Sequence, residues 1–179
     1  MTLNELVKEI QSDKAEARTA AWQQAGTLGA AAVKPLAKLC TAENPEIRRA
    51  ATRGLERIVR TVGVPGIQAG KLAVTRELLG LLGDSQPVTL RRDILWLLSE
   101  IGDAESVDIV AALLKQDALR EDARMALERI PGDTSLGALR KALGSVPKAY
   151  RLNIAQSLRA RGETVDPKKY PCQKLVPTK

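Results

Sequence analysis

Few side chains in this sequence have types and spacings that could support catalysis. There is no histidine, and the two cysteines, Cys40 and Cys172, lie far apart along the chain. Without histidine, neither a Ser-His-Asp triad nor a Cys-His pair can form, and two distant cysteines do not indicate a zinc site. The glycine-rich stretch at 63–70 has neither the spacing nor the Lys-Ser/Thr ending of a phosphate-binding loop. We therefore predict that the protein is not an enzyme and binds no metal or cofactor.

Asp93 and Asp122 are the carboxylates best placed to act together. They occupy the same position in two related stretches, LRRDILWLLSEIGD at 90–103 and LREDARMALERIPGD at 119–133. Paired carboxylates could form an acid–base or cation site. The alternative, which we favour, is a structural role in which each accepts hydrogen bonds from a neighbouring helix or pairs with a repeated arginine. Cys40 closes an apolar segment and is interpreted as a small core residue.

The two related stretches belong to a pattern that occurs five times. Its anchor is an arginine, with steps of 30, 43, 29 and 31 residues between copies: Arg18, Arg48, Arg91, Arg120 and Arg151. Apolar residues stand one residue before this anchor and three, seven and ten residues after it, on one face of a helix with 3.6 residues per turn. The fifth copy departs at the last of these positions, where it has Arg161. Each copy is therefore predicted to be an amphipathic helix.

A second amphipathic pattern precedes each copy. The five patterns begin at Leu3, Val33, Val74, Ile109 and Leu136. Capping signals agree with this reading, because Thr2 and Glu5 have capping-box spacing and Asn44-Pro45 fits an N-cap followed by the first helical residue. Asp117 is a further candidate N-cap. No segment has the pattern typical of a strand, so the sequence predicts helices throughout.

Ten helices in five antiparallel pairs, with a period near 30 residues, predict an all-α fold of the α-solenoid type. The (Ile/Leu)-Arg-x-x-Ala-x-x-x-Leu-x-x-Ile pattern and the Gly-Asp turn resemble HEAT repeats, in particular the short bacterial type similar to those of phycobilisome lyase-like proteins. The resemblance implies a right-handed, armadillo-like superhelix with the second helix of each pair on its concave side. It says little about function, because HEAT arrays serve many unrelated tasks.

The resemblance covers residues 1–162, with repeats expected at 1–29, 30–62, 63–102, 103–132 and 133–162. The long step before the third copy is assigned to extra residues at 61–70. The remaining residues, 163–179, form a basic tail that contains Pro and Lys. This tail either covers the apolar edge of the last repeat, using Leu175 and Val176, or is a free basic arm.

The net charge of +7 is confined to one end of the chain. Residues 131–179 hold ten basic and three acidic residues, so they account for the whole excess. A local field of this kind favours an acidic partner. A simpler alternative is that the charge only keeps the protein soluble.

The exposed side of the second helices is the predicted binding surface. Side chains one, five, eight and nine residues after the anchor point away from the buried stripe. The partner-binding candidates there are Arg49, Arg53, Arg57, Arg92, Trp96, Arg129 and Arg159. Guanidinium groups bind carboxylates and phosphates, and an indole adds a stacking surface. Alternatively this is a solvated face on which Glu56 and Glu128 neutralise part of the charge.

Two further points limit the prediction of this surface. The anchor arginines are excluded from it, because packing between repeats explains their recurrence. Trp96 could be half-buried packing instead of a contact residue, and Trp22, one position earlier in its own repeat, cannot be placed.

These features predict a non-catalytic HEAT-repeat scaffold that binds a protein or peptide with an acidic surface on its concave face. The alternative is nucleic-acid binding, in which the arginines and the basic C-terminal end contact the phosphate backbone. No apolar run approaches the length of a membrane span, and the first residues lack the features of a signal peptide. We therefore expect a cytoplasmic protein with no membrane partner.

Overall fold

The computed structural model describes residues 1–66 and 70–172 of the chain, and within these ranges it contains helices, turns and loops but no strand. The all-α prediction is therefore confirmed. The ten α-helices found there are α1 (Leu3–Ile10), α2 (Ala15–Gln24), α3 (Val33–Leu39), α4 (Pro45–Val62), α5 (Lys71–Leu79), α6 (Val88–Ile101), α7 (Val107–Ala112), α8 (Arg120–Arg129), α9 (Asp133–Ser145) and α10 (Arg151–Ala160). Among these helices none has the length and apolarity needed to cross a membrane. Leu175 and Val176 lie outside the described residues.

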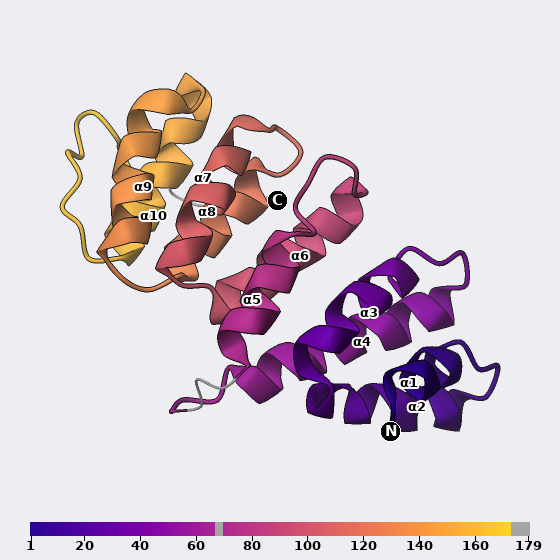
Figure 1. Ribbon diagram of the computed structural model, residues 1–179. Helices are drawn as coiled ribbons and strands as arrows, with labels where there is room; N and C mark the ends of the chain where they lie inside the picture. The colour runs from indigo at the N-terminus through magenta and orange to yellow at the C-terminus, as the bar shows by residue number, and fades with distance from the viewer. Residues whose placement is uncertain (67–69, 173–179) are drawn as a thin grey trace, which may run out of the picture. The chain divides into compact units, whose positions relative to one another are not determined.

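The helices form successive hairpins in two compact units, Met1–Ile101 and Gly102–Lys179. In the first unit α1 packs on α2, α3 on α4 and α5 on α6, and the second helices α2, α4 and α6 also pack in order (Figure 1). In the second unit α7 packs on α8 and α9 on α10, while α8 contacts α10 and α7 contacts α9. First helices stacked on first helices, and second on second, make an α-solenoid.

The core of each unit follows the predicted stripe. The residues three and seven positions after the anchor are buried in all five copies: Ala21, Ala51, Ile94, Ala123 and Ile154, then Ala25, Leu55, Leu98, Leu127 and Leu158. One expected core position is wrong, since Ile109 is 44% exposed and Val110 is buried instead. The reason is helical phase. Val110 lies three and four residues before the buried Leu113 and Leu114 and therefore shares their face.

The anchor arginines recur because they hold the turn inside each hairpin. In three copies the guanidinium donates to a main-chain carbonyl six residues earlier, at 2.7, 2.7 and 2.9 Å: Arg18 to Ser12, Arg48 to Ala42 and Arg120 to Leu114. Arg151 donates to the Val146 carbonyl at 3.4 Å, and Arg91 pairs with Asp84 at 2.9 Å. Carbonyls at the end of a helix and in the turn that follows lack an intrahelical donor, so these arginines satisfy groups that would otherwise depend on water.

Side-chain caps mark the starts of α1 and α4. The capping box at the start of α1 forms as predicted, and the Asn44 side chain caps α4, with its Oδ1 2.8 Å from the amide of Glu46. Asp117 is not the N-cap of α8. A turn delays the start of that helix until Arg120, and Asp117 pairs with this arginine instead. The residues assigned to an insertion at 61–70 begin inside α4, which continues to Val62 before the chain turns.

Candidate functional site

Helix α4 presents a row of arginines to solvent. Arg49, Arg53 and Arg57 are exposed at intervals of four residues, as expected for one face of a helix. The other faces of α4 pack against α2, α3, α5 and α6. Because those contacts fix the orientation of the helix, the three guanidinium groups project from a rigid support. We call them the α4 arginine row.

Neighbouring carboxylates neutralise the α4 arginine row unevenly. The Nη1 atom of Arg49 lies 2.6 Å from Oε1 of Glu46. Glu56, expected to neutralise part of the row, pairs instead with Arg60 at 3.8 Å. The other two arginines of the row have no carboxylate within ion-pair distance in the described parts of the chain. Their two positive charges are therefore available to a partner.

Trp22, which the sequence could not place, lies beside Arg53. The guanidinium carbon of Arg53 is 5.8 Å from the centroid of the Trp22 ring, within the range of a cation–π interaction. The turn after α2 (Ala25–Thr27) approaches α4 closely at Gly26, where a Cβ would lie 2.2 Å from the hydroxyl oxygen of Thr61. The side chains of Trp22 and Arg53 also line a cavity of about 180 Å³ between α2 and α4. Stacking on the indole restricts Arg53 before any partner binds.

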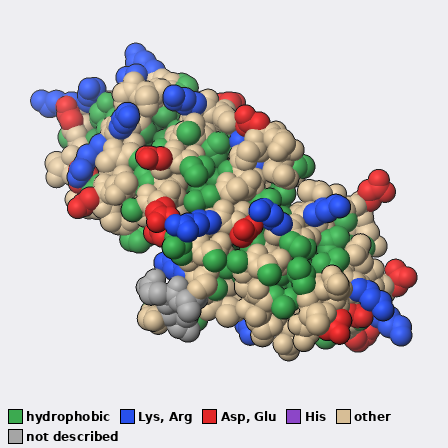
Figure 2. Space-filling model, viewed as in Figure 1, with side chains coloured by type: hydrophobic (Ala, Val, Ile, Leu, Met, Phe, Trp, Pro, Cys, Tyr) green, Lys and Arg blue, Asp and Glu red, His purple; other side chains and the backbone are tan. Residues whose placement is uncertain are grey.

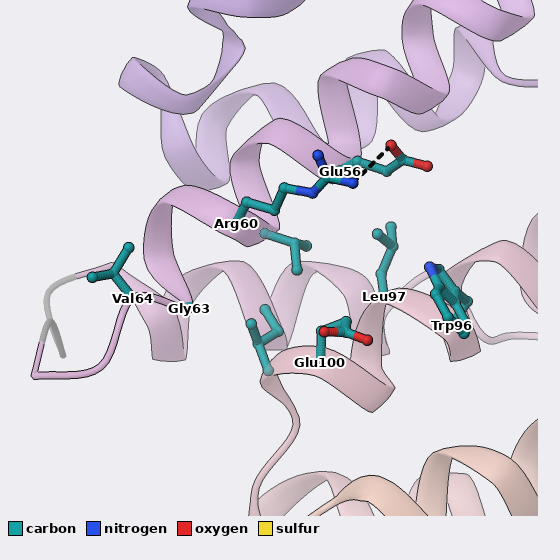
Figure 3. A pocket seen from close by; sticks show the side chains of 9 residues that line it. Glu56, Arg60, Gly63, Val64, Trp96, Leu97 and Glu100 are labelled. Carbon is teal, nitrogen blue, oxygen red and sulfur yellow. Dashed lines mark ion pairs between the residues drawn. The ribbon is translucent and has the colours of Figure 1, made fainter.

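A groove between α4 and α6 contains two cavities. The first, near the starts of the helices, has a volume of about 600 Å³ and is lined in part by Arg49, Arg53 and Asp93. The second, near their ends, has a volume of about 350 Å³ and is drawn in Figure 3. We call it the Trp96 cavity. Arg49 and Arg53 of the α4 arginine row therefore border the same groove as Trp96, whereas Arg57 lines neither cavity.

The Trp96 cavity combines an apolar wall with charged edges. Trp96 remains 44% exposed, so it only partly packs against the helices, and Val59, Leu97 and Ile101 complete the apolar lining. Figure 3 shows Glu56 and Arg60 on the α4 side, joined as an ion pair, and Glu100 on the α6 side. A cavity of this kind favours an apolar side chain, whereas its carboxylates disfavour an acidic one.

Cys40 borders the first cavity and is half-buried, not fully in the core. Burial raises the pKa of its thiol to about 11, although the hydroxyl of Thr52 donates to its sulfur at 3.6 Å. The thiol therefore stays protonated near neutral pH. Asp93 and Asp122 belong to different units. The described residues contain no group of three or more acidic or cysteine side chains arranged to hold a metal ion.

The remaining predicted residues are distributed over both units. Arg92 is exposed on α6, one turn before Trp96. Arg129 is exposed on α8. Arg159 of α10 donates to the main-chain carbonyl of Tyr170, so the tail occupies this guanidinium. Five of the seven candidates thus belong to the first unit, Met1–Ile101.

Arg124 is the centre of an ion-pair network that the repeat pattern did not predict. Its guanidinium lies 2.5 Å from Glu121, 2.6 Å from Glu128 and 2.6 Å from the hydroxyl of Ser157. The hydrogen bond from Arg124 is the main cause that holds the pKa of Glu121 below its ordinary value. This network joins α8 to α10 and explains why Glu128 does not simply neutralise the exposed face. Glutamates three residues before and four after an arginine were the available sequence signal.

The charge on the surface is mixed. On the face drawn in Figure 2, basic and acidic side chains alternate around exposed apolar ones. In the first unit the same alternation is seen along α4, where Glu46 and Glu56 interrupt the arginines. Binding there depends on individual uncompensated arginines and not on a broad basic field.

No family model matches this sequence, and a comparison with curated proteins found no match. Among solved structures the chain is similar to two engineered proteins from a structural genomics consortium, with 20% and 22% identity and TM-scores of 0.45 and 0.42. The similarity covers 89% of this chain in both cases, and 79% and 48% of the engineered chains, so this chain spans about half of the second. A designed armadillo repeat protein aligns with 11% identity and a TM-score of 0.31 over 89% of this chain and 99% of its own. At these scores the assignment of an α-solenoid rests on the helix packing of this chain itself.

Proposed function

We propose that the protein is a non-catalytic scaffold of the HEAT-repeat type whose first unit binds an acidic segment of a protein partner along α4. The observation that supports this most directly is the pair Arg53 and Arg57, two exposed cations one turn apart without carboxylate partners in the described structure. Guanidinium groups bind carboxylates through two parallel hydrogen bonds. Arg92 extends the proposal as a secondary contact within the same unit, while Arg129 and Arg159 belong to the second unit and stay predictions from the sequence.

Charge alone does not give a stable complex on this surface. Exposed ion pairs contribute about 0.2–1 kcal/mol each, so two of them change affinity by about 2- to 30-fold. Burial of one large apolar side chain contributes about 1.5–3 kcal/mol. The Trp96 cavity offers that contact in the groove bordered by Arg49 and Arg53. The proposed partner segment therefore carries acidic residues for Arg53 and Arg57 and an apolar residue for this cavity.

Quantitative co-purification tests the proposal. The wild-type chain, the double variant R53E/R57E and the control K8E/K38E are used as bait in parallel. The control makes the same change of net charge at exposed lysines on first helices α1 and α3. We expect the captured amount of at least one partner to fall about tenfold or more with R53E/R57E, and to stay unchanged with K8E/K38E. Identical sets of captured proteins from all three baits would contradict the proposal.

Nucleic-acid binding is the second candidate, supported by exposed Lys141, Lys148, Lys168 and Lys169 in the second unit. It is ranked lower because Glu46 and Glu56 interrupt the arginines of α4 and because Arg159 contacts the tail. Backbone binding would appear as a duplex-DNA mobility shift at low salt that disappears as salt is raised. The HEAT assignment and the cytoplasmic location remain proposals from the sequence.

A further inference from the structure

The tail, the first residues of α10 and the turn before it line an open cavity of about 630 Å³ in the second unit, which we call the tail pocket. Its cationic lining consists of Lys148, Arg151 and Lys169, and its apolar lining includes Leu152, Tyr170 and Pro171. Cavities of about 300–1,000 Å³ are the usual size for small-molecule sites. This pocket shares no residue with α4 or the Trp96 cavity, so it is independent of the function proposed above.

The tail wall of this pocket is held by several specific contacts. Glu163 accepts two hydrogen bonds from Arg140, at 2.5 and 3.1 Å. A turn follows in which the amide of Lys168 donates to Oδ1 of Asp166 at 2.8 Å and the amide of Tyr170 to its carbonyl at 2.9 Å. Arg159 then holds the carbonyl of Tyr170. These contacts tie the tail wall to α9 and α10, and a wall restrained in this way has less freedom to lose when a ligand binds.

The charge of the tail pocket is one-sided. No Asp or Glu lines it, and Lys148 and Lys169 have no carboxylate partner in the described parts of the second unit. Arg151 uses its Nε atom for the Val146 carbonyl, which leaves its two terminal nitrogens available. The nearest cavity along α10, which shares Leu152 and Pro171, contains Glu121.

That glutamate does not neutralise the pocket. Glu121 accepts hydrogen bonds from Arg124, Tyr150 and Asn153 and is therefore already satisfied on its own side of Leu152. Burial and the hydrogen bond to Glu121 raise the pKa of Tyr150, so this phenol adds no negative charge. Among the residues that the structure describes, three cations around an apolar lining therefore face the pocket without an opposing anion.

We propose that the tail pocket binds a free anionic amphiphile, a carboxylate on an aliphatic chain of roughly ten carbons. The carboxylate would lie among Lys148, Arg151 and Lys169, where charge-assisted hydrogen bonds are available. The chain would cover Leu152, Tyr170 and Pro171. Each methylene removed from water favours binding by up to about 0.8 kcal/mol, and the cations select the anion over a neutral or cationic ligand of the same length.

Titration of the full-length protein with decanoate tests this inference, with decyltrimethylammonium as the cationic counterpart and both kept below micelle formation. Binding is followed by calorimetry and by methyl NMR shifts of Leu152. We expect decanoate to bind at one site with a Kd of about 1 mM or tighter and the cationic probe to leave the Leu152 signals unchanged. K148E/K169E should weaken decanoate binding about tenfold or more, whereas K8E/K38E should not.

Three results would overturn the inference: equal binding of both probes, unchanged affinity in K148E/K169E, or equal loss in both double variants. Vesicles of anionic phospholipid form a further arm, and binding to vesicles without binding of free decanoate would also contradict it. Melting curves of the variants verify folding, which is expected to be intact because both lysines are exposed. Partner capture through Arg53 and Arg57 is unaffected by any of these outcomes.

Discussion

Arginine has two separate roles in this chain, and the groups within its reach decide which one a given residue has. The anchor arginines, such as Arg18 and Arg48, stand near the start of a second helix and donate to carbonyls in the turn that follows the first. Arg53 and Arg57 stand in the middle of α4, where the helix has satisfied every nearby carbonyl. Their guanidinium groups are left to solvent, an indole or a partner.

The two cysteines provide a prediction at the same scale. The pKa of Cys40 is about 11, raised by burial, while Cys172 is exposed. Only the thiolate reacts, and a raised pKa favours the neutral thiol at every pH below it. At pH 8 we expect about one thiolate in a thousand for Cys40, so dithionitrobenzoate should modify one thiol quickly and the second only after denaturation.

The matched control for this experiment is Cys172→Ser. It should abolish the fast reaction and leave only the thiol that reacts after denaturation. Two fast phases of equal rate in the wild-type protein would show that Cys40 is open to solvent. A fast phase that survives in the Cys172→Ser variant would lead to the same conclusion.

At the scale of elements, Arg161 shows why one repeat departs from the pattern. Other copies have Leu or Ile ten residues after the anchor, and this copy has an arginine. At distances of 2.9–3.3 Å its guanidinium donates to the carbonyls of Leu127, Glu128, Ile130 and Gly132 and to the hydroxyl of Ser135. The acceptors at 127–130 lie at the end of α8, and Gly132 and Ser135 lie at the start of α9. Arg161, which follows α10, therefore caps the end of α8 from the next hairpin.

Restoring the repeat pattern with Arg161→Ile should therefore destabilise the protein. The substitution leaves carbonyls at the end of α8 without their donor, and each buried unsatisfied group costs about 1–3 kcal/mol. We expect a lower urea midpoint, monitored by circular dichroism at 222 nm. Arg161→Lys retains the charge but has fewer hydrogen-bond donors. Its urea midpoint should lie between those of the wild type and of Arg161→Ile. A midpoint equal to or above that of the wild type would show that the apolar pattern governs this position after all.

At the scale of the whole molecule, the two proposed binding surfaces belong to different units. The α4 arginine row and the Trp96 cavity belong to Met1–Ile101, and the basic C-terminal region with the tail pocket belongs to Gly102–Lys179. In a repeat array each hairpin depends on its neighbours, and terminal repeats need cover. The described part of the tail gives that cover to α9 through Arg140 and to α10 through Arg159.

Removing the tail should therefore lower thermal stability. A chain ending at Glu163 keeps the pair with Arg140 but loses the contact between Arg159 and Tyr170 and the apolar contacts of Pro171. A loss of about 1 kcal/mol corresponds to a fall in Tm of roughly 2–5 °C. A chain ending at Cys172 is the matched control, since it keeps every contact described for the tail. Equal melting of the two truncated chains would show that residues 164–172 do not stabilise the array.

The sequence by itself determined the helices and their buried faces. A period of 3.6 residues is local information, and it placed positions such as Ala51, Ile94 and Leu127 in the core because any amphipathic helix must bury its apolar stripe. The same period separated the anchor arginines from Arg49, Arg53 and Arg57, and it predicted correctly that these three are exposed on one helix. Where the local phase was misread, at Ile109, the prediction failed.

Only the tertiary structure decided which exposed charges remain available. Glu56 could pair with several arginines by spacing, and side-chain geometry on α4 assigned it to Arg60. Trp22 stacks on Arg53 across 31 positions of sequence, and Arg159 is held by Tyr170 of the tail. These contacts depend on how closely neighbouring hairpins and the tail approach, a distance set by packing between helices and not by the period of any one of them.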